Sequence, residues 1–409
     1  MGERDRADVA VVGAGAAGVG VGVALSMLDL DVRIVDREAI GASFRRWPEE
    51  MRFITPSFPS NGFGLPDLNA VTPQTSPAYA LGRQQPSGEE YAEYLERVVE
   101  FFELDVETGV EVEAVRPVES PNGVREEATE AVAVDGGASE GAGFVLETSE
   151  GALDARFVVW AGGQFGSPRR GVVGGEELCV HTAEVDSWAE YARAASTREF
   201  LVVGGYESGI DAAVGLVEAG TSVTVVDRGE PWDEHDPDPS EVLSPYTRER
   251  LDAVRGSDRL SLVGGIEAER VERTDDGGFV LVGSFADEHV RETPDYRHRF
   301  TVPTRPLLAT GFEPTLGPVA EQFPRRRGTI ELTDRDESPE VPGLFLAGPD
   351  VTHRGVKFCF IYKFRSRFPV VAETIGERLG VETDVLEVYR ENNVFLDDLS
   401  CCEEGMCEC

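Results

Sequence analysis

Lysine is nearly absent from this sequence. Only Lys357 and Lys363 occur among its 409 residues, so arginine supplies the other 36 of the 38 basic residues. Against these stand 76 acidic residues, which give a net charge of −38. A chain of this charge is repelled by the phosphate backbone of nucleic acids and by anionic lipid surfaces. The composition therefore argues against nucleic acid as a partner.

The acidic excess and the scarcity of lysine together favour adaptation to concentrated salt. In molar salt the Debye length falls to about 3 Å, so repulsion between surface carboxylates is screened while their hydration keeps a protein in solution. The alternative interpretation is a single acidic face that docks a partner. Acidic residues run from Glu3 to Glu408, however, and are not gathered in one segment. We therefore favour salt adaptation.

One apolar stretch, Val9–Leu28, contains no charged residue and is about as long as a membrane span. Five glycines interrupt it, residues 1–6 before it carry both signs of charge, and no A-x-A cleavage pattern follows it. We therefore expect no membrane span and a soluble, cytoplasmic protein. Hydrophobic residues at 41% are enough to fill a core, and 409 residues suffice for two or three domains.

Cysteine is also scarce before residue 400, where only Cys179 and Cys359 occur. The other four cysteines lie in the last nine residues. This distribution excludes a disulfide framework spread over the chain and favours a reducing compartment.

What the sequence does contain is an internal repeat. Residues 11–37 and 202–228 align without a gap at an offset of 204 − 13 = 191 positions. Each copy reads as a short buried strand, a glycine turn, a helix and a second strand that ends in an acid, Asp36 or Asp227. The glycines at the turn are Gly13, Gly15 and Gly18 in the first copy.

This order of elements is typical of dinucleotide binding. The first glycine makes a tight turn, the second lets the backbone approach a pyrophosphate, and the third lets helix and strand pack closely. The pyrophosphate lies at the positive N-terminus of the helix, and the acid binds the hydroxyls of the adenosine ribose. One glycine pattern alone is weak evidence. Two copies in one register, each with its acid, indicate two dinucleotide sites.

The chain therefore resembles the flavoproteins with two dinucleotide-binding domains, the broad family of thioredoxin reductases, bacillithiol-disulfide-reductase-like proteins and flavin-containing monooxygenases. Segments 157–163 and 306–311 resemble the crossover strands between the two domains, and 343–350 resembles the late FAD motif. The resemblance implies an α/β fold with two Rossmann-like domains, the NAD(P) domain inserted in the FAD domain. It implies bounds of 1–165 and 312–390 for the FAD domain, 166–311 for the NAD(P) domain and 391–409 for a cysteine-rich tail.

The resemblance also implies cofactor contacts, with FAD in the first unit and NAD(P)H in the second. In the FAD domain these are Gly13, Gly15, Ala16, Gly18, Asp36, Arg37, Ser43, Phe44, Val112, Ala161, Gly162 and Asp350. In the second unit and its return strand they are Gly204, Tyr206, Glu207, Ser208, Gly209, Asp227, Arg228, Thr310 and Gly311. Pro349 separates Asp350 from the Gly-Asp ending that is usual in the family.

Tyr206 stands where the second copy of the motif should have its middle glycine. A tyrosine there would crowd the pyrophosphate, so we expect a displaced nucleotide or a ring that swings away. Asp227 favours NADH, because a carboxylate repels a 2′-phosphate, whereas the adjacent Arg228 keeps NADPH open.

Residues 48–88 hold seven prolines and predict a long irregular excursion that covers the flavin and shapes the substrate pocket. An amphipathic helix is expected over Glu89–Phe102, with Ser87 and Glu90 spaced as a capping box. Alternating segments near 110–116, 130–134, 143–148 and 153–160 predict a β-meander, and 135–143 predicts an exposed loop.

The electron acceptor is the open question. Disulfide reductases of this family place a C-x-x-C or C-x4-C pair beside the flavin, and no such pair occurs before residue 400. Bacillithiol-disulfide-reductase-like relatives carry a cysteine where this chain has Ala17. Cys359 and His353 remain as candidate catalytic residues just after the late FAD motif, and Arg354 is a candidate anion contact. A packed cysteine and a loop histidine bonded to backbone are the structural alternatives.

The C-terminal cysteines Cys401, Cys402, Cys407 and Cys409 leave three interpretations open. They can form a redox or metal-handing arm like the cysteine pair of mercuric reductases, a thiolate site for zinc or copper(I), or a tail without a role. The spacing fits the usual zinc pattern poorly.

Three function classes follow. The first is an FAD-dependent NAD(P)H oxidoreductase acting on a small-molecule or thiol acceptor. The second is a flavin monooxygenase, although only His181 remains of the motif that such enzymes carry between the units. The third is a nucleotide-binding sensor without turnover. Relatives often dimerise, so a homodimer is compatible with the resemblance.

Overall fold

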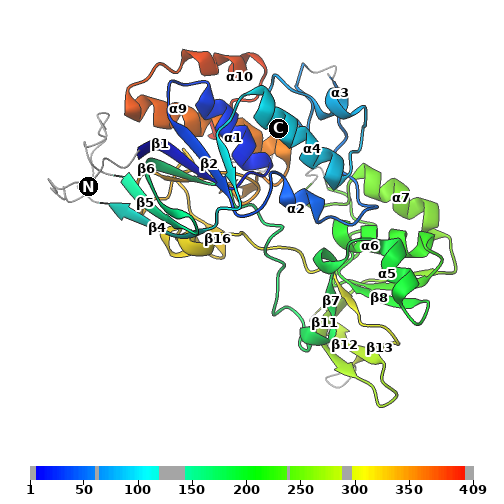
Figure 1. The fold of residues 1–409 in the computed structure, drawn as a ribbon. Helices are drawn as coiled ribbons and strands as arrows, with labels where there is room; N and C mark the ends of the chain where they lie inside the picture. Colours follow the sequence, from blue (N-terminus) through cyan, green and yellow to red (C-terminus); the bar gives the residue numbers. More distant parts are fainter. Residues whose placement is uncertain (1–5, 60–63, 119–142, 237–239, 288–296, 401–409) are drawn as a thin grey trace.

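The computed structural model describes residues 6–59, 64–118, 143–236, 240–287 and 297–400. Two separate sheets, one mixed and one parallel, are each covered by helices and form its two units (Figure 1). The cysteine-rich end of the chain, Cys401–Cys409, lies outside the described residues.

The first sheet has seven strands in the order β3-β2-β1-β6-β5-β4, with β17 paired to β6. Its strands are β1 (Arg6–Val12), β2 (Val32–Asp36), β3 (Val106–Thr108), β4 (Val112–Val118), β5 (Gly143–Thr148), β6 (Gly151–Trp160) and β17 (Leu344–Leu346). Strand β1 lies between β2 and β6, in the middle of the sheet. Its apolar run Val9–Val12 is buried, as expected for a parallel strand that is covered on both faces.

The β-meander is present as β4, β5 and β6, which pair antiparallel in sequence order. The strand expected at 130–134 and most of the expected loop at 135–143 lie outside the described residues.

The second sheet has five strands in the order β10-β9-β8-β14-β7, all paired in parallel. Its strands are β7 (Val180–His181), β8 (Glu199–Val203), β9 (Ser222–Val226), β10 (Leu260–Val263) and β14 (Leu307–Leu308). A three-stranded antiparallel sheet lies beside it, made of β11 (Ile266–Arg273), β12 (Phe279–Phe285) and β13 (His298–Val302). The chain leaves the first sheet after β6 and returns at β17, so the second unit is inserted in the first. The predicted α/β class is confirmed.

Helix α1 explains the uncharged stretch near the start of the chain. It spans Ala16–Ser26, and all but its last residue are buried. A Cβ on Gly20 would lie 2.2 Å from the ring of Phe368, so this glycine lets α1 pack against α9 (Phe368–Leu379). The stretch Val9–Leu28 is therefore a buried strand and a buried helix. No helix in the described part of the chain is both long and apolar enough to cross a membrane.

The remaining α-helices have between 4 and 14 residues. The α-helices are α2 (Ala42–Arg45), α3 (Pro77–Leu81), α4 (Gly88–Phe101), α5 (Trp188–Ala194), α6 (Glu207–Glu218), α7 (Pro245–Arg255), α8 (Ile361–Phe364) and α10 (Glu387–Glu391). The 3-10 helices are Glu176–Leu178, Thr182–Glu184, Gly317–Gln322, Arg365–Arg367 and Asp384–Leu386. Two small hairpins complete the list, β15 (Arg325–Arg326) with β16 (Thr329–Ile330), and β18 (Thr352–His353) with β19 (Val356–Lys357).

The proline-rich excursion is anchored by buried polar contacts. Arg365 donates to the carbonyl oxygens of Asp67 and, at 2.9 Å, of Ala70. Burial lowers the pKa of Arg365 to about 10. The capping box of α4 forms as expected, because the Glu90 amide donates to Ser87 Oγ and the Ser87 amide donates to Glu90 Oε2. The excursion is less irregular than expected, since it contains α3.

Candidate functional site

A cavity of about 610 Å³ lies where the two units meet, and it is lined from both. Its wall includes most of the residues that the resemblance assigned to cofactors: Gly13, Gly15, Ala16, Asp36, Arg37, Ser43, Phe44, Val112, Ala161, Gly162, Tyr206, Glu207 and Ser208. The candidate catalytic residue Cys359 also lines it. The wall does not include Gly18, Gly204, Gly209, Asp227, Arg228, Thr310, Gly311, Asp350 or His353.

Gly13, Gly15 and Gly18 of the first glycine turn lie in three different environments. Gly13 has a φ of 110°, which side chains rarely adopt. A Cβ on Gly18 would lie 1.7 Å from the carbonyl oxygen of Gly13, so this position closes the turn against the helix. A Cβ on Gly15 would meet no atom within 4 Å. The protein itself therefore does not require a glycine at position 15, whereas a ligand beside the N-terminus of α1 would.

Asp36 is held beside this turn by two backbone amides. Its Oδ2 accepts from the Ala14 amide at 2.6 Å and its Oδ1 accepts from the Glu38 amide at 2.7 Å. The carboxylate is fixed at the end of β2, where it lines the cavity. Glu38 in turn binds Arg46, with 2.6 Å between Oε1 and the guanidinium. These residues fit FAD, because the open space at Gly15 suits a pyrophosphate and Asp36 suits ribose hydroxyls.

The second turn repeats this geometry in detail. Gly204 has a φ of 101°, and a Cβ on Gly209 would lie 1.9 Å from the Gly204 carbonyl oxygen. Asp227 accepts from the Gly205 amide at 2.6 Å and from the Gly229 amide at 2.7 Å. The internal repeat therefore extends to equivalent hydrogen bonds, and Gly204, Gly209 and Asp227 build the turn from behind the cavity wall.

Tyr206 fits the second turn because the backbone there is extended. Its φ and ψ are −89° and −165°, close to the −83° and −167° of Gly15, so no left-handed conformation is needed. The phenol hydroxyl donates to the carbonyl oxygen of Val242 at 2.7 Å. The ring is thus tied to the segment before α7.

Glu207 lines the cavity, but its carboxylate is engaged with the start of α7. It accepts from the Ser244 amide and from the hydroxyls of Ser244 and Thr247. Burial raises the pKa of Glu207 despite these hydrogen bonds. The side chain of Glu207 therefore fixes the start of α7 to α6.

Both lysines of the chain lie close to Cys359. Its Sγ is 3.2 Å from Ser240 Oγ, to which Lys363 Nζ donates at 2.9 Å. Lys357 Nζ pairs with Glu241 Oε1 at 2.9 Å. The first unit thus contacts the second unit at Ser240 and Glu241, beside the thiol. Sequence reasoning missed these contacts, because the paired residues lie 116 to 123 positions apart in the chain.

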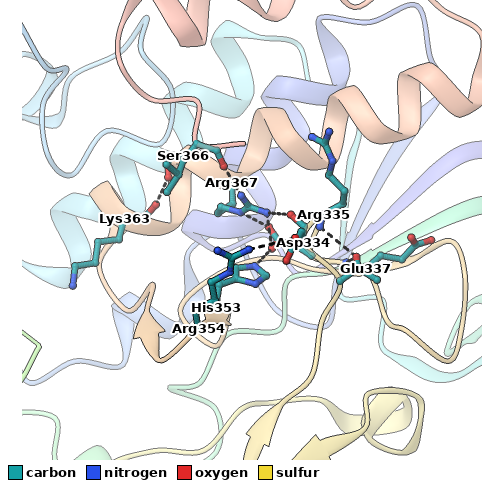
Figure 2. A network of polar contacts seen from close by, with 11 residues as sticks. Asp334, Arg335, Glu337, His353, Arg354, Lys363, Ser366 and Arg367 are labelled. Carbon is teal, nitrogen blue, oxygen red and sulfur yellow. Dashed lines mark hydrogen bonds and ion pairs between the residues drawn. The ribbon is translucent and has the colours of Figure 1, made fainter. Parts of the chain in front are cut away.

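His353 lies in a buried ion network outside the cavity wall (Figure 2). Its Nε2 is 2.5 Å from Asp336 Oδ1, and the Arg367 Nε donates to Asp336 Oδ2 at 2.9 Å. None of the three side chains is more than 5% exposed. The catalytic role of His353 stays a prediction, and its side chain lies outside the cavity wall. Arg354 lies beside the network, 3.9 Å from Asp334, and not in the cavity wall.

The other predicted residues lie near the wall. Pro349 lines the cavity, and Asp350 follows it with a pKa that burial raises to about 7. Thr310 donates to the Arg169 carbonyl at 3.1 Å, and the Arg169 amide donates to the Gly311 carbonyl at 2.9 Å. Thr310 and Gly311 therefore join segment 306–311 to Arg169, which follows segment 157–163. The role of Arg228 toward a nucleotide stays a prediction.

The chain matches the family profile described as pyridine nucleotide-disulphide oxidoreductase over residues 10–134 and 126–348. The chain belongs to this family. Its members are FAD-dependent oxidoreductases that use NAD(P)H, so the chain is an enzyme and FAD and NAD(P)H are its cofactors.

Similar proteins include both disulfide reductases and monooxygenases. Bacilliredoxin reductase Bdr from Bacillus subtilis is 22% identical over 238 residues, which cover 58% of this chain and 66% of that protein, just under two thirds. A bacillithiol disulfide reductase from Staphylococcus aureus has a TM-score of 0.66 at 16% identity, covering 91% of this chain and 99% of its own. A mutant flavin monooxygenase from Stenotrophomonas maltophilia has a TM-score of 0.65 at 16% identity, with coverages of 92% and 99%. At such identities the two structures share the fold.

Proposed function

We propose that this chain is an FAD-dependent NAD(P)H oxidoreductase that reduces a small-molecule disulfide. The observation that carries the proposal is one cavity lined by both glycine turns and by a thiol, that of Cys359. Bound FAD would accept a hydride from NAD(P)H and give both electrons to the acceptor. Gly15, Ser43 and Phe44 would hold FAD, and the N-terminus of α6 would hold the pyrophosphate of NAD(P)H.

Cys359 provides the chemistry for a disulfide acceptor. Its thiolate attacks one sulfur of the disulfide, and the sulfur that leaves takes a proton from solvent. The mixed disulfide on Cys359 then takes two electrons and one proton, which regenerates the thiolate and releases the second thiol. Two electrons and two protons thus convert one disulfide to two thiols, and NAD(P)H supplies the electrons and one proton.

One guanidinium in the cavity wall supports an anionic acceptor. Arg52 and Lys357 both line the cavity, but Lys357 is paired with Glu241. Arg52 donates to the carbonyl oxygens of Glu49 and Met51, at 2.6 and 2.7 Å, and not to carboxylates. Its charge is therefore available to a carboxylate on the substrate.

The prediction for Cys359 is a loss of disulfide reduction alone. In Cys359→Ala we expect NADH to reduce the flavin as before, whereas reoxidation by a small-molecule disulfide slows about 100-fold or more. Cys179→Ala is the matched control, because burial raises the pKa of that thiol to about 11 and makes it a poor nucleophile. Stopped-flow reoxidation under anaerobic conditions measures both variants.

The outcome of that experiment separates the function classes. Unchanged disulfide reduction in Cys359→Ala would exclude Cys359 as the nucleophile, and serine variants of the four tail cysteines would then test the tail. Rapid reoxidation by oxygen with an oxygenated product would favour the monooxygenase alternative. His181 is the one residue that remains of the monooxygenase motif. Its side chain is fully buried, and its Nδ1 accepts from the Ala183 amide.

The choice between NADH and NADPH is a second part of the proposal. Asp227 is fixed at the end of β9, and Glu230, Asp233 and Glu234 line a hollow beside it. This group of carboxylates disfavours a 2′-phosphate, so we propose NADH as the preferred donor.

Asp227→Ser removes this carboxylate and is therefore expected to shift preference toward NADPH by about tenfold. The shift is no larger because molar salt already screens part of the repulsion between the carboxylate and the 2′-phosphate. The ratio of flavin reduction rates at limiting NADH and NADPH measures the shift. Asp36→Ser is the matched control, which should weaken FAD binding and leave the ratio unaltered. A ratio unchanged in Asp227→Ser would remove Asp227 as the determinant.

The composition supports a proposal about where the protein works. We infer residence in a cytoplasm with concentrated salt from the net charge of −38 and the near absence of lysine. The division into domains at 165, 311 and 390, and a homodimer, are likewise proposals that the resemblance suggests.

A further inference from the structure

The two units are joined by a carboxylate at the start of a helix. Glu50 belongs to the excursion of the first unit, and α5 belongs to the second. Glu50 Oε1 accepts from Ser187 Oγ at 2.8 Å and from the Ala189 amide at 3.0 Å, and its Oε2 accepts from the Trp188 amide at 3.0 Å. One carboxylate of the first unit therefore satisfies two of the amides that α5 leaves open.

The contact completes the cap of α5. Ser187 is the N-cap residue, and its Oγ accepts from the Glu190 amide at 3.3 Å. The amides of Trp188 and Ala189 have Glu50 as their partner. A backbone hydrogen bond from the Glu49 amide to the Asp186 carbonyl, at 2.7 Å, holds the excursion in line with the helix.

The ionised carboxylate of Glu50 favours a contact with α5 that persists at neutral pH. Burial acts to raise the pKa of Glu50, but the hydrogen bonds from Ala189, Ser187 and Trp188 outweigh it and lower the pKa. A lowered pKa means that the ionised form is the one the contact stabilises. The contact is therefore complete above the ordinary carboxyl range and is lost only as the pH falls through the lowered value.

Helix α5 connects the Glu50 contact to α6, the helix whose N-terminus lines the cavity. Trp188, its first residue, is fully buried and packs against α6, where a Cβ on Gly215 would lie 2.5 Å from the indole. Its Nε1 donates to Asp211 Oδ2 at 2.9 Å, and Asp211 also pairs with Arg250 of α7. The N-terminus of α6, with Glu207 and Ser208, lines the cavity. Figure 1 shows α5 and α6 side by side in the second unit.

The excursion that carries Glu50 is itself part of the cavity wall. Pro48, Met51 and Arg52 line the cavity on either side of Glu49 and Glu50. One short segment thus contacts the first site directly and the second site through α5. We propose that Glu50 is a positioning residue, which fixes α6 relative to the flavin so that the nicotinamide donor lies within reach of it. This inference rests on the proposed function.

Glu50→Gln tests the proposal, because an amide keeps the shape but turns a donor toward α5. Glu49→Gln is the matched control, since it removes the same charge from an exposed neighbour whose contacts are made by the backbone. Four properties of the protein are measured in molar salt. The first is hydrogen exchange at the Trp188 and Ala189 amides, and the second is the FAD content. The third and fourth are the limiting rate of anaerobic flavin reduction by NADH and the Kd for NADH.

In Glu50→Gln we expect faster exchange at both amides and a limiting reduction rate lower by about 10- to 100-fold, the cost of a misplaced donor. FAD content and the Kd for NADH should stay within about threefold of the parent values, because the variant changes placement and not binding. Glu49→Gln should match the parent protein in every measurement. Glu50→Asp keeps the charge one methylene shorter and should fall between them, and it takes over the test if Glu50→Gln does not fold.

A parent-like reduction rate in Glu50→Gln would overturn the proposal, as would equal losses in Glu49→Gln or a rate loss explained by lost FAD. If neither NADH nor NADPH reduces the flavin of the parent protein, the proposed function fails. The exchange comparison then still decides whether Glu50 holds α5.

Discussion

A Gly15→Val variant is expected to fold and to lose its flavin. The Cβ position of Gly15 has no atom within 4 Å, so the protein leaves open space where the added side chain begins. The backbone there is already in the extended region that valine favours. The side chain would instead fill the space beside the N-terminus of α1, where a pyrophosphate must approach the amides. We expect FAD affinity to fall about 100-fold or more, and the unfolding midpoint of the flavin-free protein to stay unchanged.

Gly18→Ala is the contrasting variant in the same turn. Its Cβ would lie 1.7 Å from the Gly13 carbonyl oxygen, a separation that no packed structure tolerates. We expect Gly18→Ala to lower the stability of the flavin-free protein, in contrast to Gly15→Val. Flavin content after reconstitution and denaturant unfolding of the flavin-free protein distinguish the two effects. Full flavin retention in Gly15→Val would show that the cofactor does not lie on this turn.

Asp336→Ala is expected to give the largest loss of stability. The Asp336 side chain is 0% exposed and joins Arg367, which is 2% exposed, to His353. Its removal leaves a buried guanidinium without its carboxylate, which costs about 3–5 kcal/mol. Asp336 also has a φ of 63°, a left-handed conformation that aspartate and asparagine adopt more readily than alanine. Denaturant unfolding in molar salt measures the loss.

Two variants show whether charge or backbone is responsible. Asp336→Asn keeps the backbone preference and one acceptor, so its loss should be smaller than that of Asp336→Ala. Asp334→Ala is the matched control in the same loop, because its side chain is 72% exposed and lies 3.9 Å from Arg354. An exposed pair of this kind contributes about 0–1 kcal/mol. Equal losses in Asp334→Ala and Asp336→Ala would contradict a special role for the buried network.

The repeat was predictable because dinucleotide-binding turns depend on local backbone geometry. The spacing of Gly13, Gly15, Gly18 and Asp36 is set by one turn, one helix and one strand, and the second copy obeys the same constraints. Tyr206 is the departure from the motif in the second copy. Its backbone is extended like that of Gly15 and its hydroxyl donates to the Val242 carbonyl oxygen, and its expected effect on the position of the nucleotide stays a prediction.

The contacts between distant segments could not be predicted from spacing. Glu50 meets α5 after 137 positions, and Lys357 meets Glu241 after 116, so no local pattern links them. His353 was predicted to be catalytic because it follows the late FAD motif. In the structure its imidazole contacts Asp336, which lies 17 positions earlier, a contact that the sequence did not predict, and its catalytic role stays a prediction.

The central claim is that the first glycine turn holds FAD and the second receives NAD(P)H at the same cavity. The most direct test is an anaerobic titration of the protein, purified in molar salt, with NADH and then NADPH while the flavin absorption band is recorded. We predict a yellow protein whose flavin band bleaches with one equivalent of nicotinamide donor. A colourless protein that takes up no FAD, or a bound flavin that neither donor reduces, would contradict the claim.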